Sequence, residues 1–154
     1  MVKVLAGDDL ITRRLRAKVR LDYKSETKPN KFLFGGKNVE DAAEEVREQK
    51  VSLLRNVPIQ GIGIEDIDMS VEIYVVKDDM SGHTVAYAPV LITVSADSIE
   101  DLSRFIIADE FRKIEILEPE QIFYDRQDLE RFLFKISQEM RQYIGQIERR
   151  YTQK

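Results

Sequence analysis

Apolar and polar residues alternate most clearly between residues 17 and 23. Ala17, Val19, Leu21 and Tyr23 are separated by charged residues, so an extended chain here has one apolar face and one charged face. A period of two residues is typical of a strand that covers one side of a core. The pattern therefore predicts a strand at 17–23.

Residues 71–118 carry the densest series of patterns in the chain. Two apolar stretches are joined by a polar connection that contains Gly82, which indicates a hairpin. After the hairpin, the residues from Ser98 to Asp101 match the helix-capping pattern [ST]-x-x-[DE], and apolar residues continue at helical spacing. The elements expected here are strands at 71–77 and 84–95, a helix at 98–111 and a strand at 113–118.

A helix is also expected at 39–56, because apolar residues recur along one side of it and Asn38 can cap its start. The helix should end before Pro58, since a proline disfavours helical geometry in the preceding residue. Ahead of this helix, the pattern at 31–34 predicts a short strand that ends at Gly35.

Read in order from residue 31 to residue 118, these elements follow the ferredoxin-like order β-α-β-β-α-β. We therefore expect an α+β fold in which an antiparallel sheet carries its helices on one face. The strand at 17–23 would be an N-terminal addition, and residues 59–69 an extended or partly strand-like connection. Residues 1–5 could form a short strand, whereas residues 10–15 show no clear period. The single domain predicted over 1–154 comprises a sheet with two helices at 17–118 and a C-terminal helix at 126–152.

The pattern at 126–152 predicts a long amphipathic helix capped by Asp125. Its apolar stripe alternates spacings of four and three residues, as in a coiled coil, but Phe132 and Ile144 widen the stripe and favour packing on the chain's own sheet. Phe134 lies off the stripe, and its exposure would indicate a contact surface. The residues predicted to contact another copy are Phe134, Met140, Tyr143, Ile147 and Tyr151.

The composition is that of an ordinary globular protein of single-domain length, with 43% hydrophobic and 34% charged residues. The chain contains no cysteine, which excludes disulfides and thiolate chemistry and fits a reducing compartment. No apolar run reaches the roughly 20 residues needed to span a bilayer. We therefore expect a cytoplasmic protein that does not bind membranes.

The net charge of −4 is unevenly distributed, because residues 1–24 carry +4 and the rest −8. A basic cluster on the expected strand could contact phosphates, with strong salt dependence. The acidic remainder and the lack of interleaved aromatic residues disfavour nucleic-acid binding. The alternative is a charged face that meets solvent or pairs with the acidic helix residues at 40–48. The cluster consists of Arg13, Arg14, Arg16, Lys18 and Arg20.

The best candidate for an anion site is Gly35–Gly36–Lys37–Asn38, between an expected strand and a helix start. Glycines let the backbone approach a ligand closely, and free N–H groups at a helix N-terminus attract anions. The first glycine of the phosphate loop G-x-x-x-x-G-K-[ST] is absent, however. A turn followed by an ordinary helix cap is the simpler explanation of these residues.

Other combinations of reactive residues give no catalytic assignment. His83 near Asp78 and Asp79 could form an acidic site, but aspartate, serine and glycine are the usual residues of a hairpin connection. Ser81 lacks the G-x-S-x-G context of a nucleophile, and the carboxylates at 65–68 lack EF-hand spacing. We expect no cofactor and no metal site.

These observations favour a non-enzymatic binding or regulatory domain that self-associates through a sheet edge or its terminal helix, as a homo-oligomer and in the simplest case a dimer. The first alternative is a protein or enzyme that binds a small phosphate or carboxylate ligand at Gly35–Asn38. The second is nucleic-acid binding through the basic cluster. The motifs resemble no family.

Overall fold

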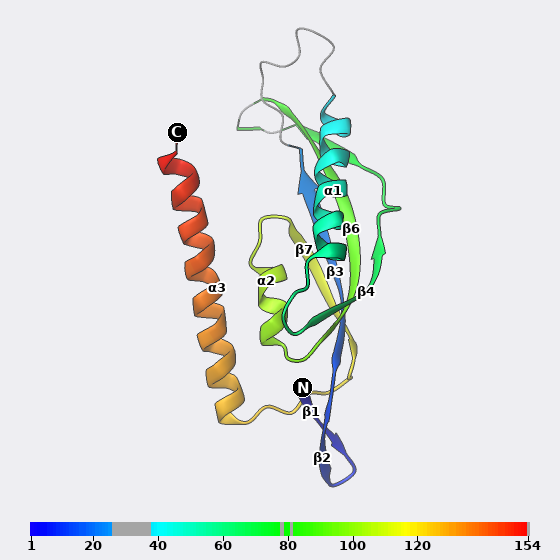
Figure 1. Ribbon diagram of the computed structural model, residues 1–154, viewed down its shortest axis with the longest axis vertical. Helices are drawn as coiled ribbons and strands as arrows, with labels where there is room; N and C mark the ends of the chain where they lie inside the picture. Colours follow the sequence, from blue (N-terminus) through cyan, green and yellow to red (C-terminus); the bar gives the residue numbers. More distant parts are fainter. Residues whose placement is uncertain (26–37, 78, 81, 154) are drawn as a thin grey trace.

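The structure is a computed structural model that describes residues 1–25, 38–77, 79–80 and 82–153. A twisted sheet carries helices on one face, and a long helix stands beside them (Figure 1). The elements in chain order are β1 (Val2–Ala6), β2 (Asp9–Arg13), β3 (Leu15–Lys24), α1 (Val39–Asn56), β4 (Ile62–Asp68), β5 (Tyr74–Lys77), β6 (Thr84–Ala96), the 3₁₀ turn η2 (Glu100–Leu102), α2 (Ser103–Ile106), β7 (Phe111–Glu118) and α3 (Arg126–Thr152).

Strands β3 and β6 form the centre of the sheet. Their neighbours follow the order β4-β6-β3-β7, each pair antiparallel, and β5 pairs with the opposite end of β6 from β4. Val19 lies opposite Ile92 in the central pair, and both are fully buried. The strands β1 and β2 form a separate N-terminal hairpin.

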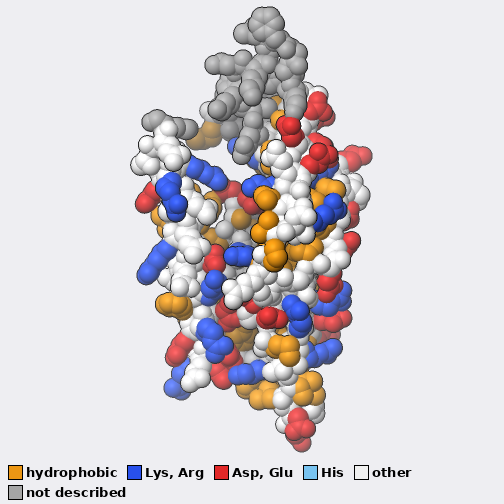
Figure 2. Space-filling view, in the orientation of Figure 1, with side chains coloured by type: hydrophobic (Ala, Val, Ile, Leu, Met, Phe, Trp, Pro, Cys, Tyr) orange, Lys and Arg blue, Asp and Glu red, His pale blue; other side chains and the backbone are white. Residues whose placement is uncertain are grey.

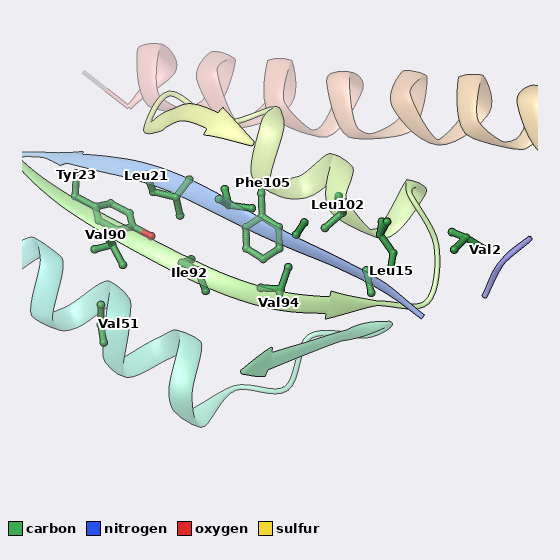
Figure 3. Close-up of a cluster of buried hydrophobic side chains, with 13 residues drawn as sticks. Val2, Leu15, Leu21, Tyr23, Val51, Val90, Ile92, Val94, Leu102 and Phe105 are labelled. Carbon is green, nitrogen blue, oxygen red and sulfur yellow. The ribbon is translucent and has the colours of Figure 1, made fainter. Parts of the chain in front are cut away.

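One face of the central strands forms the hydrophobic core. Helix α1 contributes Val51 to this core, and the η2–α2 segment contributes Leu102 and Phe105, so all these helical segments cover the same face (Figure 3). The opposite face carries the charged residues of β3, such as Arg16 and Lys18. This division follows directly from the two-residue period of the strands.

The expected α+β class is confirmed by the mostly antiparallel sheet and by the three α-helices of the described chain. The helices expected at 39–56 and 126–152 have those bounds. The strand expected at 31–34 lies outside the described residues. The expectation that 17–23 is an addition to the sheet was wrong, because β3 is flanked by β6 and β7.

Two further expectations are corrected by the path between α1 and β7. The helix expected at 98–111 ends at Ile106, and Phe111 already belongs to β7. The reason is a hydrogen bond of 2.8 Å from the Asp22 N–H to the Glu110 carbonyl, which joins this part of the chain to the sheet. The strand expected at 71–77 is confined to Tyr74–Lys77. The partly strand-like alternative for 59–69 is confirmed, because this segment contains β4, which pairs with β6.

No helix in the described part of the chain is long and apolar enough to cross a membrane.

Candidate functional site

Helix α3 begins at a well-defined cap. The side chain of Asp125 accepts the Asp128 N–H at 2.9 Å, and the side chain of Asp128 accepts the Asp125 N–H at 3.1 Å, which is a complete capping box. Lys3 of β1 donates to both carboxylates at 3.0 and 3.1 Å. These bonds raise the pKa of Lys3, with Asp125 as the larger cause. The start of α3 is therefore tied to the N-terminal hairpin.

Beyond this cap, α3 packs only lightly on its own chain. None of its 27 residues is buried. Its main contacts are with α2 and η2, and the expectation that it packs on the sheet was wrong. Leu102 and Phe105 already cover that part of the sheet, so α2 lies between the sheet and α3 (Figure 3).

One side of α3 presents an apolar stripe to solvent. At roughly 100° per residue, its members fall within a narrow sector of the helix surface. Each of them is at least half exposed. The stripe consists of Leu129, Leu133, Met140, Ile144 and Tyr151, and we call it the α3 stripe.

The five residues expected to contact another copy do not share one side of α3. Met140 and Tyr151 belong to the α3 stripe, and Ile147 is half-buried on the same side. Phe134 is 65% exposed but lies roughly 120° around the helix from the stripe. Tyr143 faces the protein body, where its hydroxyl donates to the Asp109 carboxylate, and this bond raises the pKa of Tyr143.

A cavity of about 650 Å³ lies between α3 and the protein body. Its walls come from β3, α1, β6, the α2–β7 segment and α3, and Lys and Arg side chains gather along the recess beside α3 (Figure 2). No pattern in the sequence indicates this site, because its basic residues are spread over more than a hundred positions and share no motif. The basic residues of the lining are Lys24, Lys50, Arg104, Arg112 and Arg150.

A buried carboxylate forms part of the cavity wall. Asp22 is only 2% exposed and accepts Arg20 Nε at 2.9 Å and the Tyr74 hydroxyl at 2.6 Å. Arg112 Nε lies 3.7 Å from the same carboxylate. Burial, followed by the bond to Asp22, raises the pKa of Tyr74. The charge of Asp22 is thus neutralised by two arginines.

Two aromatic rings extend this cluster across the sheet. Tyr74 and Tyr87 stack with ring centroids 5.3 Å apart, and the Arg112 guanidinium lies 5.4 Å from the centre of the Tyr87 ring. The contacts join β5, β6 and β7 at the end of the sheet nearest the cavity. They fix the position of Arg112 at the cavity wall.

The basic cluster of β2 and β3 is largely paired with carboxylates. Arg16 donates to Glu65 at 2.8 Å and to Glu118 at 3.3 Å, and the bond from Arg16 lowers the pKa of Glu65. Arg14 lies 3.4 Å from Asp97. The acidic partners therefore come from β4, from the end of β7 and from the residue after β6, in place of the helix residues 40–48.

Of the candidate anion site, only Asn38 lies within the described residues. Its side chain accepts the Asp41 N–H at 2.7 Å, as an ordinary helix cap does. Gly35, Gly36 and Lys37 lie outside the described residues, as does Asp78 near His83. Among the residues that are described, no group of His, Asp or Glu side chains could hold a metal ion.

Comparison of the chain with protein-family models, with curated proteins and with solved structures found no match.

Proposed function

We propose that this protein is a non-enzymatic binding domain that self-associates through α3, with the α3 stripes of two copies packed against each other in an antiparallel dimer. The observation that carries the proposal is the exposed apolar stripe on a helix with no buried residue. Contiguous exposed apolar surface of this kind marks interaction sites in soluble proteins.

The length of α3 supports a second copy as the occupant. A helix of 27 residues is roughly 40 Å long. The stripe runs from Leu129 to Tyr151, nearly this whole length. A stable interface buries about 800 Å² per partner. A helix of the same length and pattern is a partner that can cover the stripe from end to end.

The charges beside the stripe favour the antiparallel arrangement. Arg126, Glu130, Arg141 and Glu148 lie along the edge of the stripe that faces away from the body, and all four are exposed. In an antiparallel pair whose helices cross near Ser137, Arg126 of each copy lies beside Glu148 of the other copy. Glu130 of each copy then lies within one helical turn of Arg141 of the other copy. A parallel pair would set this edge against the opposite edge of the partner helix, where Glu139, Tyr143 and Arg150 already face the protein body.

The same proposal includes a ferredoxin-like core and a cytoplasmic location. The segments β3, α1, β4, β6, α2 and β7 follow the order β-α-β-β-α-β with β3 as the first strand, and their order in the sheet supports this core. The absence of cysteine supports the location. Anion binding at Gly35–Asn38 stays a prediction. Nucleic-acid binding has less support, because Arg14, Arg16 and Arg20 pair with carboxylates.

Sedimentation velocity over a range of protein concentrations tests the self-association. We expect the wild type to form dimers and Leu133→Glu to shift the protein to monomers, because the substitution puts a charge into the centre of the stripe. Phe134→Glu is the matched control, since both residues are 65% exposed and adjacent but lie on different sides of α3. A wild type that stays monomeric at high micromolar concentration, or equal effects of both variants, contradicts the proposal.

A further inference from the structure

We infer that the cavity between α3 and the body binds a small organic anion that carries at least two phosphate or carboxylate groups. This inference concerns a different side of α3 from the proposed dimer contact. Glu139, Tyr143 and Arg150 line the cavity, and they lie roughly 100° around the helix from the α3 stripe. Ligand binding and dimer formation can therefore be tested separately.

The first support is a set of cations that have no hydrogen-bond or ion-pair partner within the part of the chain that the structure describes. Lys24, Lys50, Arg104 and Arg150 line the cavity. Among the described residues, no hydrogen bond or ion pair engages any of these four side chains. They come from β3, α1, α2 and α3, so they surround the cavity from different elements. Positive groups that converge on one space without acidic partners are the arrangement that binds a polyanion.

The second support is that two of the four carboxylates of the lining are already paired with cations. Asp22 is held by Arg20 and Arg112, as described above. Glu139 pairs with Lys135 at 2.9 Å. Asp109 accepts the neutral Tyr143 hydroxyl, which leaves the charge of the carboxylate in place. Glu110 is the fourth carboxylate, so two carboxylates stand against the four cations named above. The groups free to act on a ligand are therefore predominantly positive.

The size and polarity of the cavity define the class of ligand. A volume of about 650 Å³ exceeds the space of a single inorganic phosphate and lies within the range of small-molecule sites, roughly 300–1,000 Å³. Val46, Ile107 and Ala108 add a limited apolar surface for a carbon skeleton. The lining thus fits a compact metabolite with charged groups at more than one position.

A ligand in this cavity would connect α3 to the rest of the protein. Arg150 belongs to α3, whereas Lys24, Lys50 and Arg104 belong to the body. An anion that bridges them stabilises the position of the distal half of α3, which its own contacts hold only lightly. Binding should therefore increase the amide protection of α3 as well as the melting temperature.

Isothermal titration calorimetry with pyrophosphate and with citrate tests the inference, with sodium chloride at matched ionic strength as the blank. We expect saturable binding of at least one anion, and the two titrations distinguish phosphate from carboxylate preference. Arg104→Gln and Arg150→Gln should each weaken the affinity by roughly tenfold, because each removes a charge-assisted contact. Both side chains are exposed, so the fold should persist.

Arg141→Gln is the control, because Arg141 lies on α3 but away from the cavity and should leave the affinity unchanged. Leu133→Glu should also retain binding, since it changes only the stripe. The inference is overturned if neither anion binds at millimolar concentration, or if Arg141→Gln weakens binding as much as Arg150→Gln does, which would indicate general charge attraction.

Discussion

Strand β3 and helix α3 show the same kind of sequence pattern but opposite burial. The apolar residues of β3 are almost completely buried between α1, α2 and the neighbouring strands. Helix α3 is amphipathic along its whole length, yet none of its residues is buried. An amphipathic pattern therefore identifies an apolar face without identifying what covers it. In β3 the cover is the same chain, and for α3 we propose a second copy.

Because of this difference, the sheet and the helices packed on it should contribute much more to the free energy of unfolding than α3 does. Burying a large aliphatic side chain contributes roughly 1.5–3 kcal/mol, and the described core draws almost all its fully buried residues from the sheet, α1 and the η2–α2 segment. Helix α3 adds little of this kind within one chain. The sheet should thus unfold as the cooperative unit, and α3 should respond mainly to its partner or ligand.

The largest expected effect comes from truncating one apolar residue in each region. Ile92→Ala removes a fully buried side chain and should lower the free energy of unfolding by about 2–5 kcal/mol. Leu133→Ala removes a side chain that is 65% exposed and should change it by less than about 0.5 kcal/mol for the monomer. Urea denaturation at low protein concentration measures the free energy of unfolding of both variants. Equal losses of stability in the two variants would contradict the expectation that the sheet contributes more than α3.

Glycine substitutions should act in opposite directions in the two regions. Gly61 precedes β4 with a φ of +77°, and an added Cβ would lie 2.4 Å from the Asp101 carboxylate, so Gly61→Ala should destabilise the fold by about 1–3 kcal/mol. Its left-handed conformation places this glycine in the turn that leads into β4.

In α3, Gly145→Ala should stabilise the helix by up to about 1 kcal/mol. A Cβ there meets only the end of the flexible Arg149 side chain, at 3.9 Å. Hydrogen exchange resolved by residue measures the local effect, and circular dichroism during thermal unfolding measures the global one. Destabilisation by Gly145→Ala would show that α3 is packed more closely than its exposure indicates.

The smallest effect concerns the base of α3 at acidic pH. The Asp128 N–H, followed by Lys3, lowers the pKa of Asp125. A carboxylate whose pKa is lower in the folded state stabilises that state at any pH above its pKa in the unfolded chain, which is about 3.9. This stabilisation is lost as the pH falls through the pKa of the folded state. Below about pH 4 the first turn of α3 should therefore loosen before the sheet unfolds.

Amide exchange at 126–130, corrected for intrinsic rates, reports this loosening. Asp125→Asn keeps a cap acceptor but has no titrating carboxyl group, so it should lower the protection at neutral pH and weaken its dependence on pH. If the amide protection of Asp125→Asn matches that of the wild type at every acidic pH, the Asp125 carboxylate does not stabilise the first turn of α3.

Local patterns predicted the regular elements of the fold well. The bounds of α1 and α3 follow from the Asn38 and Asp125 caps and from helical spacing, which are properties of neighbouring residues. The helix expected at 98–111 failed because its end depends on a contact between Glu110 and Asp22, far apart in the chain. The central position of β3 likewise depends on pairing with β6 and β7.

The candidate site could be predicted only in part, for the same reason. The stripe of α3 is visible in the sequence, although its exposure depends on α2 lying between it and the sheet. The cavity could not be predicted, because Lys24, Arg104 and Arg150 meet only through tertiary structure. Tyr143 was assigned to a partner contact because nothing in the sequence indicates its bond to Asp109.

The most direct test of the antiparallel α3 dimer is disulfide formation between single-cysteine variants. The chain has no cysteine, so Arg126→Cys and Glu148→Cys each introduce one defined thiol. The proposal predicts that mixing the two variants under mild oxidation yields mainly a mixed dimer that joins position 126 to position 148, and that Leu133→Glu abolishes it. Preferential dimers of one variant alone, or no cross-linking when sedimentation shows dimers, would contradict the antiparallel pairing of α3.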